Sequence, residues 1–265
     1  MSAMASTSCD KLPVVFVGPT VQVSEASRVL EAIYLPPAAQ GSIVSAVQRF
    51  APSAILLVDG GFQTEPAVRH KELLWALSAG VPVIGAGSMG ALRAAELWPY
   101  GVHGVGAIYR WYRRYAFAPD DAVAVLHGPA ELGCRPLTQA LVDLRLTFRM
   151  AERRGRIDAA LRRRLDAAAG RLNFRDRTLE QVVEAALGPG AEAGSRQHLA
   201  ADLEASFASQ KKIDALKALA WLNGCSHLGL LPDPALAPFR LTAAFLRDLH
   251  DAGLETAPLP AAPPR

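Results

Sequence analysis

The 265-residue sequence has little cysteine and no long apolar run. Its three cysteines, Cys9, Cys134 and Cys225, are far apart, form no CxxC motif and have no histidine at ligand spacing. This pattern excludes a disulfide framework and a structural zinc site. No stretch approaches the roughly 18 uninterrupted apolar residues of a membrane span. Residues 1–11 also lack the apolar core of a secretory signal. We therefore expect a soluble, cytoplasmic protein with no metal site.

The overall composition is that of an ordinary globular protein, with 51% hydrophobic and 20% charged residues. The net charge of +3 is small, but its distribution is uneven. Between Arg149 and Arg177 the chain carries ten arginines against four acidic residues, a local charge of +6. Such a segment suits an acidic protein surface, a peptide or a nucleic acid. A solvated, arginine-rich helix explains it equally well.

Short apolar runs alternate with segments of helical spacing through the first half of the chain. The runs that predict strands cover residues 14–17, 54–58, 81–84 and 122–126, and helices are expected over 24–30, 66–78, 89–97 and 109–115. Continuous apolar strands between helices are typical of a parallel sheet that is covered on both faces. The pattern predicts an α/β fold with an open parallel (Rossmann-like) sheet, helices on both faces and a helical C-terminal region.

Strand signals stop after Pro136, and the chain becomes rich in Ala, Leu, Arg and Glu. We expect an α/β core domain over residues 11–137, a helical region over 138–250 and a Pro/Ala-rich tail over 251–265.

Polar residues follow the expected strands at one edge of the sheet. Asp59 and His127 come directly after an apolar run, and Thr20 and Ser88 come three and four residues after one. In open α/β sheets, ligands bind beyond the carboxyl ends of the strands. We therefore expect these four side chains to surround one pocket.

Ser88 lies in the sequence Ala86-Gly87-Ser88-Met89-Gly90, between a strand and a helix. This spacing resembles a G-x-S-x-G nucleophile elbow with alanine in the first position. Backbone N–H groups of Met89, Gly90 and Ala91, at the start of the helix, would be free to hold an anion or oxyanion. A serine that only caps an ordinary strand-to-helix turn fits the same sequence.

His127 is a candidate general base, because an imidazole of ordinary pKa, about 6.5, exchanges protons near neutrality. A histidine bonded to a nearby carbonyl is the alternative. A Ser–His–Asp triad is difficult to complete, because Asp121 lies about 20 Å from His127 along the same expected strand. Asp59 and Glu131 remain as orienting acids, which weakens the prediction of a plain esterase.

Three further charged residues lie on helices that flank this edge. His70 follows Asp59 on the next expected helix, near the positive helix N-terminus, where an anionic substrate would bind. Lys71 and Arg93 are candidate substrate-binding residues on the same grounds. Lys71 also fits a solvent-facing position, and Arg93 fits a local ion pair with Glu96.

The glycine-rich segments do not predict a nucleotide cofactor. The turn at 18–20 is too short for a Walker A loop, and residues 85–90 lack its lysine. The spacing of Gly85, Gly87 and Gly90 matches G-x-G-x-x-G, but no acidic ribose partner follows. We expect no cofactor.

Several segments together resemble the TfuA family. They are VFVGPT, YLPPAAQG, LLVDGGFQTEPAVRHKELLWALSAGVPVIGAGSMGALRAAELWPYGVHGVGAIYRWY and DDAVAVLHGPAELGCRPL. The resemblance covers residues 14–144 and is densest over 59–93. The later segment Gln210-Lys211-Lys212-x-Asp214-Ala215 is also similar to a family element.

This resemblance implies a role in peptide backbone thioamidation beside a YcaO enzyme, which uses ATP to activate an amide oxygen. The TfuA-like protein would supply sulfide by hydrolysing the C-terminal thiocarboxylate of a ubiquitin-like sulfur carrier. A precursor peptide would be an indirect partner, and neither a nucleic acid nor a membrane is expected.

A thiocarboxylate is already negative, so the site must neutralise it before water attacks. The amides of residues 88–91, with His70, Lys71 or Arg93, would do this, and Asp59 or His127 would position and deprotonate water. We expect direct attack by water rather than an acyl-Ser88 intermediate. Two alternatives remain: a non-catalytic adaptor that docks carrier, peptide and YcaO enzyme, and a stand-alone serine hydrolase that uses Ser88.

Overall fold

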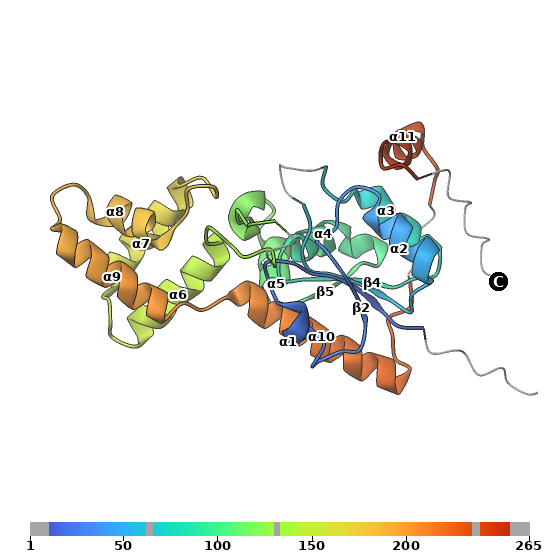
Figure 1. Ribbon diagram of the computed structural model, residues 1–265, viewed down its shortest axis with the longest axis horizontal. Helices are drawn as coiled ribbons and strands as arrows, with labels where there is room; N and C mark the ends of the chain where they lie inside the picture. The colour runs from blue at the N-terminus through green and yellow to red at the C-terminus, as the bar shows by residue number, and fades with distance from the viewer. Residues whose placement is uncertain (1–10, 62–65, 130–132, 235–238, 255–265) are drawn as a thin grey trace, which may run out of the picture.

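A computed structural model describes residues 11–61, 66–129, 133–234 and 239–254 (Figure 1). Within these ranges the chain forms a parallel sheet of five strands in the order β2-β1-β3-β4-β5. The strands are β1 (Val14–Phe16), β2 (Ile33–Leu35), β3 (Ile55–Leu57), β4 (Val83–Ala86) and β5 (His103–Val105). The order reverses between β1 and β3, which is where open α/β sheets bind ligands. The predicted fold class is confirmed.

Helices cover both faces of the sheet. The first part of the chain contributes α1 (Val23–Ala26), α2 (Ser42–Phe50), α3 (His70–Ser78), α4 (Met89–Leu97), the short 3-10 helix η1 (Trp98–Tyr100) and α5 (Ala107–Arg114). One face packs against α2, α3 and α4 through a core that includes Ile43, Leu73 and Leu92. The other face packs against α1 and α10. Strands β1, β3 and β4 are therefore fully buried, as their continuous apolar sequences predict.

The helical C-terminal region does not pack as a single unit (Figure 1). It contains α6 (Leu141–Arg153), α7 (Ala159–Arg171), α8 (Leu179–Leu187), α9 (Ala193–Ala205), α10 (Gln210–Leu228) and α11 (Ala243–Asp251). Helices α6 to α9 form their own core around Leu144, Phe148 and Leu165. Helix α10 leaves this group and runs back along the sheet, where Ala215 and Leu219 pack against it. In the described ranges, no helix combines the length and apolar character needed to cross a membrane.

The prediction of a strand at residues 122–126 is wrong. The fifth strand is β5, which lies in the glycine-rich stretch before α5, and it occupies the edge of the sheet beside β4. Residues Asp120–Val123 instead form a 3-10 helix, η2. The chain then turns back on itself, since Leu137 N donates to the Leu126 carbonyl and Gly128 N donates to the Arg135 carbonyl. Apolar character alone does not separate a buried strand from another buried segment.

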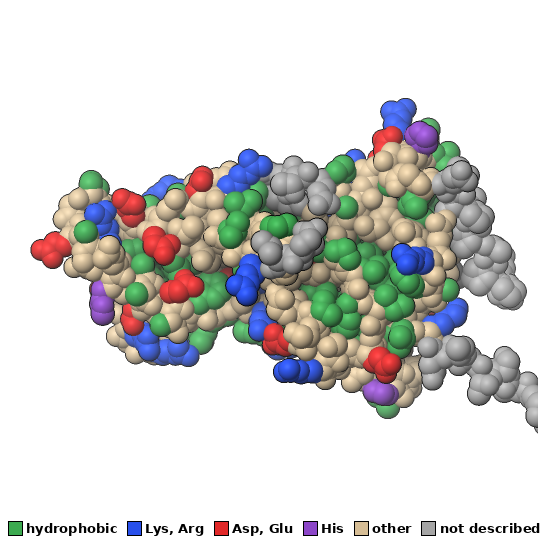
Figure 2. Space-filling view, viewed as in Figure 1, with side chains coloured by type: hydrophobic (Ala, Val, Ile, Leu, Met, Phe, Trp, Pro, Cys, Tyr) green, Lys and Arg blue, Asp and Glu red, His purple; other side chains and the backbone are tan. Residues whose placement is uncertain are grey.

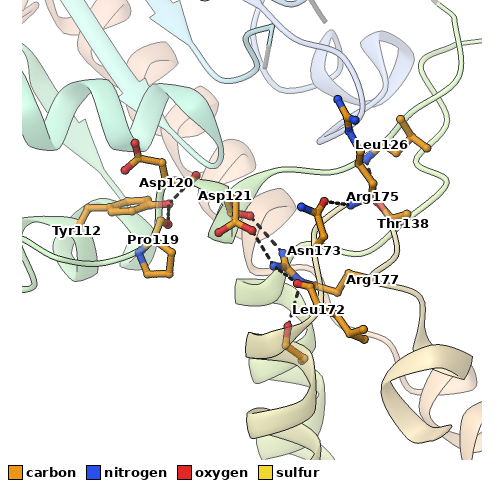
Figure 3. A network of polar contacts seen from close by, with 11 residues as sticks. Tyr112, Pro119, Asp120, Asp121, Leu126, Thr138, Leu172, Asn173, Arg175 and Arg177 are labelled. Atoms are coloured by element: carbon orange, nitrogen blue, oxygen red, sulfur yellow. Dashed lines mark hydrogen bonds and ion pairs between the residues drawn. The ribbon is translucent and has the colours of Figure 1, made fainter. Parts of the chain in front are cut away.

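Side chains from other elements hold the backbone of the 119–127 segment in place (Figure 3). The Tyr112 hydroxyl donates to the Pro119 carbonyl at 3.1 Å, and Arg177 donates to the backbone and carboxylate of Asp121. Thr138 Oγ1 accepts from Leu126 N at 2.8 Å. These bonds satisfy backbone groups that a neighbouring strand would otherwise pair.

Helix α3 begins at His70, four residues later than predicted from Pro66. The Pro66 carbonyl accepts from Gln40 N in an extended pairing, so this part of the chain is not helical. Glu72 Oε1 accepts from Arg69 N at 3.1 Å and so caps the helix one residue before His70.

Candidate functional site

A cavity of about 80 Å³ lies at the carboxyl edge of the sheet. It is enclosed by the loops that follow β1, β3 and β4 and by the 119–127 segment, with contributions from α10 and the α7–α8 connection. Its lining side chains include Asp59, Ser88, Met89, His127, Arg175 and Lys211. The structure thus brings three of the predicted catalytic residues, Asp59, Ser88 and His127, to one cavity at the point where the strand order reverses.

Asp59 joins the loops that follow β3 and β1. Its Oδ2 accepts from Gly18 N at 2.9 Å and from Thr20 N at 3.0 Å, and its Oδ1 accepts from the Thr20 hydroxyl at 2.5 Å. Both side chains are buried. Because both carboxylate oxygens are already bonded, the geometry favours a positioning role for Asp59 over the predicted role of proton acceptor. Thr20 takes part in this clamp and does not itself line the cavity.

Ser88 precedes helix α4 and is buried, with no hydrogen bond to Asp59 or His127 among the described residues. The glycines around it allow close packing. A Cβ on Gly90 would collide with the Leu57 carbonyl, and a Cβ on Gly85 would collide with the Gly90 carbonyl. The helix start therefore rests directly on β3 and β4.

In this close packing, two of the backbone N–H groups that were predicted to be free donate hydrogen bonds within the protein. Gly90 N donates to the Val58 carbonyl at 3.1 Å, and Ala91 N donates to the Ser88 carbonyl at 2.9 Å. The expectation that the amides of residues 89–91 together hold an anion is wrong for two of the three. A full oxyanion cradle at this helix start is not supported.

His127 lies at the outer wall of the cavity and is exposed. Its Nδ1 is 2.8 Å from the Gly128 carbonyl oxygen. A carbonyl only accepts hydrogen bonds, so Nδ1 carries the proton, and Nε2 of the neutral ring is left as the acceptor. This is the tautomer that a general base working through Nε2 requires.

Lys211, in the first turn of α10, is a lining residue that the site prediction omitted. Its side chain is 3% exposed, and its Nζ donates to the Val123 carbonyl at 2.8 Å. Its backbone N–H donates to Asp143 Oδ1 at 3.0 Å. Burial raises the pKa of Asp143, and the charge of Lys211 acts against that rise. The cavity thus contains a buried amino group with donor capacity beyond the Val123 carbonyl.

A sequence signal for Lys211 exists in the pattern of α10. Lys211, Ala215, Ala218 and Leu222 follow one another at helical spacing and are all buried. A lysine in line with an apolar stripe is therefore a candidate for a buried function. The segment 210–215 is part of the family resemblance. Lys211 is absent from the polar residues that follow expected strands, because this residue lies on a helix far from those strands in the sequence.

The predicted residues His70, Lys71 and Arg93 lie elsewhere, and none is among the described residues that line the cavity. His70 Nε2 is 2.8 Å from Glu96 Oε2, and Arg93 donates to the same oxygen at 2.7 Å. Lys71 Nζ donates to the Arg240 carbonyl at 3.1 Å. The structure does not bring these cations to the substrate position proposed for them, because they lie along the outer side of α3 and α4.

The arginine-rich segment 149–177 does not form a single basic patch. Arg177 is buried and bonded to Asp121, while Arg162 pairs with Glu152 and Asp166. Figure 2 shows acidic and basic side chains interspersed over the visible face of the helical region. Several of the ten arginines are therefore paired within the fold, which argues against one continuous basic patch over this segment.

The last predictions to compare with the structure concern Glu131 and a metal site. Glu131, considered as an orienting acid, lies outside the described residues, as does the tail after residue 254. Within the described ranges, no group of three or more His, Cys, Asp or Glu side chains is arranged to hold a metal ion.

Fold and site together define a doubly wound α/β protein with a small polar pocket at the point of strand reversal. Residues 59–178, a little under half of the chain, match the family model described as TfuA-like protein, and this match supports assignment to the TfuA family. The match begins at Asp59 and includes the 119–127 segment and Arg177. No curated protein matches the chain. The family assignment suggests a role in thioamidation-related biosynthesis.

Proposed function

We propose that this protein releases hydrosulfide from the C-terminal thiocarboxylate of a ubiquitin-like sulfur carrier and supplies it to a YcaO enzyme that thioamidates a peptide. The reaction takes place in the cavity lined by Ser88, His127 and Lys211. The family match supports the general role, and the chemistry of the cavity supports the reaction.

The reaction balances without a redox partner. The oxygen of water attacks the carbonyl carbon of R–C(=O)S⁻, the C–S bond breaks, and sulfur leaves with the bonding electron pair. The products are R–COOH and HS⁻, and the acid then loses its proton to solvent. The difficulty lies in bringing a nucleophile to a group that already carries negative charge.

Lys211 is the single observation that carries this proposal. Its ammonium group lies in the cavity, where it would offset the charge of the thiocarboxylate and the additional charge that develops during attack. A buried cation in the cavity acts more strongly on an anion bound there than His70 and Arg93 can, because His70 is exposed to screening water and Arg93 is bonded to Glu96 outside the cavity.

His127 and Asp59 have complementary roles. His127 Nε2 accepts the proton from the attacking water, since Nδ1 is bonded to the Gly128 carbonyl, and returns this proton to the sulfur that leaves as HS⁻. Asp59 holds the loop at Gly18 and Thr20, and so fixes the wall of the cavity. Both residues were predicted to be catalytic; the proposal keeps His127 as the base and makes Asp59 a positioning residue.

The substitution Lys211→Met tests the proposal, with Lys217→Met as the matched control. Lys217 lies on the same helix, is exposed, and is not among the lining residues of this cavity. Hydrosulfide release from a thiocarboxylated carrier should fall at least about 100-fold in Lys211→Met and change little in Lys217→Met. Thermal unfolding of both variants checks that the fold is kept. Equal activity in both variants would favour the non-catalytic adaptor.

Ser88→Ala separates attack by water from a covalent mechanism. Ser88 has no hydrogen bond to His127, so the activated pair of a serine hydrolase is not formed. We expect hydrosulfide release to remain within about threefold of the parent protein, since loss of a nucleophile would cost a factor of thousands. Labelling of Ser88 by a fluorophosphonate, with activity lost in Ser88→Ala, would contradict the proposal.

A further inference from the structure

A second, larger cavity adjoins the site. It measures about 490 Å³ and is formed where the turn before α1, the start of α6 and the α9–α10 connection meet. It shares three lining residues with the smaller cavity: Pro19, Val125 and Lys211. Lys211 therefore lies at the junction of the two cavities. We call the larger cavity the tail groove.

The lining of the tail groove offers both polar and apolar contacts. Gln139 lines it, and the side-chain oxygen of this residue is buried with no hydrogen-bond partner among the described residues. A buried acceptor without a partner costs free energy that an incoming N–H would recover. Phe207 also lines the groove, and this residue is 36% exposed. A polypeptide backbone with occasional apolar side chains can use both contacts.

The charges along the groove give it a direction. Lys211 is buried and lines both the groove and the site, and Asp143 lines the groove beside it, with burial raising the pKa of that carboxyl. Glu204 is exposed on another wall, and Glu25 pairs with Lys212 at 2.7 Å. An anionic chain terminus is therefore favoured at the junction, and neutral or basic residues are favoured beside Glu204.

From this arrangement we propose that the tail groove binds the extended C-terminal segment of a protein whose terminal thiocarboxylate enters the smaller cavity. This inference rests on the proposed function, and it adds a binding site for the chain that precedes the reacting group. The groove thus makes the site selective for a polypeptide terminus over a free small thioacid.

Two substrates separate the groove from the chemistry. The first is a synthetic peptide with a terminal glycine thiocarboxylate, and the second is thioacetate, which is too short to reach the groove. The substitution Glu204→Trp places a bulky ring on the groove wall, and Phe207→Ala removes an apolar contact. Glu180→Trp is the control, because Glu180 is exposed on α8 and is not among the groove's described lining residues.

We expect kcat/KM for the peptide to fall about tenfold in Glu204→Trp and severalfold in Phe207→Ala. Hydrolysis of thioacetate should stay within about twofold in every variant. Equal losses for both substrates would show that the groove acts only through the fold, and unchanged peptide hydrolysis would show that nothing binds there. Either result overturns the proposal.

A binding measurement keeps this inference separate from the proposed function. A fluorescent peptide with an ordinary C-terminal carboxylate should bind the parent protein and lose affinity in Glu204→Trp, as measured by fluorescence anisotropy. If the parent protein hydrolyses neither substrate but binds this peptide in the groove, the proposed reaction fails and the groove stands. If the peptide binds equally to the parent protein and to Glu204→Trp, the groove proposal fails even where hydrolysis is observed.

Discussion

Helix α4 separates two groups of charged side chains that the sequence presents as equivalent. At its N-terminal end, Ser88 and Asp59 share a cavity with the buried Lys211. Along its outer side, Arg93 and Glu96 meet His70 at the surface. Lys211 as a whole residue is 3% exposed, while the side chains of Arg93, Glu96 and His70 are 14%, 34% and 47% exposed. Both groups of residues contain ionisable side chains, but water reaches His70 and Glu96 and is largely excluded from Lys211.

This difference determines what each group can do. An exposed ion pair contributes little, because water and salt screen its charges and its long side chains lose rotational freedom. A buried cation interacts strongly with an anion that enters its cavity. Residue type and position near a strand end do not separate the two cases. Burial separates the two cases, and it favours the cavity that contains Lys211 as the candidate site.

The largest expected effect comes from Gly90→Ala, at the packed end of α4. The added methyl group would collide with the Leu57 carbonyl, which is backbone and cannot turn away. We expect a loss of about 3 kcal/mol or more in the free energy of unfolding, or failure to fold, as measured by denaturant titration.

Gly170→Ala is the control for this prediction. Gly170 lies within α7, where a Cβ would meet nothing within 4 Å. There the higher helix propensity of alanine should raise the free energy of unfolding by up to about 1 kcal/mol. A small effect at both positions would mean that α4 does not rest directly on β3.

Asp59→Ala should have the next largest effect. It removes the acceptor for Gly18 N, Thr20 N and the Thr20 hydroxyl, three donors in a mostly buried loop. Because unpaired buried donors are costly, we expect roughly 2–4 kcal/mol of destabilisation together with loss of hydrosulfide release. The comparison is Asp158→Ala, which removes one exposed cap on Leu161 N and should cost about 1 kcal/mol. Equal costs for the two variants would argue against the clamp.

The smallest expected effect is on the outer side of α4, at Glu96. Burial acts to raise the pKa of Glu96, but the hydrogen bonds and charges of His70 and Arg93 outweigh it and lower the pKa. The ionised form therefore stabilises the fold above the ordinary carboxyl pKa, and this contribution is lost as pH falls through the lowered value.

Glu96→Gln should accordingly cost roughly 0.3–1 kcal/mol near pH 7, within the range for exposed pairs. The difference from the parent protein should shrink below about pH 4 as the carboxylate takes up a proton. Denaturant titrations at both pH values measure it. Hydrosulfide release should not change, and a large loss of activity would return His70, Arg93 and Glu96 to the candidate site.

The prediction of the fold succeeded where local pattern and burial agree. The apolar runs before Gly18 and Asp59 and the run before Ser88 each form a parallel strand covered on both faces. It failed at residues 122–126, whose apolar character reflects packing beside the sheet rather than pairing within it. Arg177, Lys211 and Thr138 supply the bonds there, and no local pattern around residue 122 reveals them.

The order of apolar strands and helical spacings by itself determined the class of fold, and with it the edge of the sheet where Asp59 and Ser88 lie. The periodicity of neighbouring residues encodes this information, because strands and helices form through local geometry and the burial of one face. Only the tertiary structure decided that Lys211 enters the cavity, that the carboxylate of Asp59 is occupied, and that His70 and Arg93 lie outside. Those outcomes depend on the exclusion of water by segments distant in the chain, and the burial of a charge is settled only when such segments pack together.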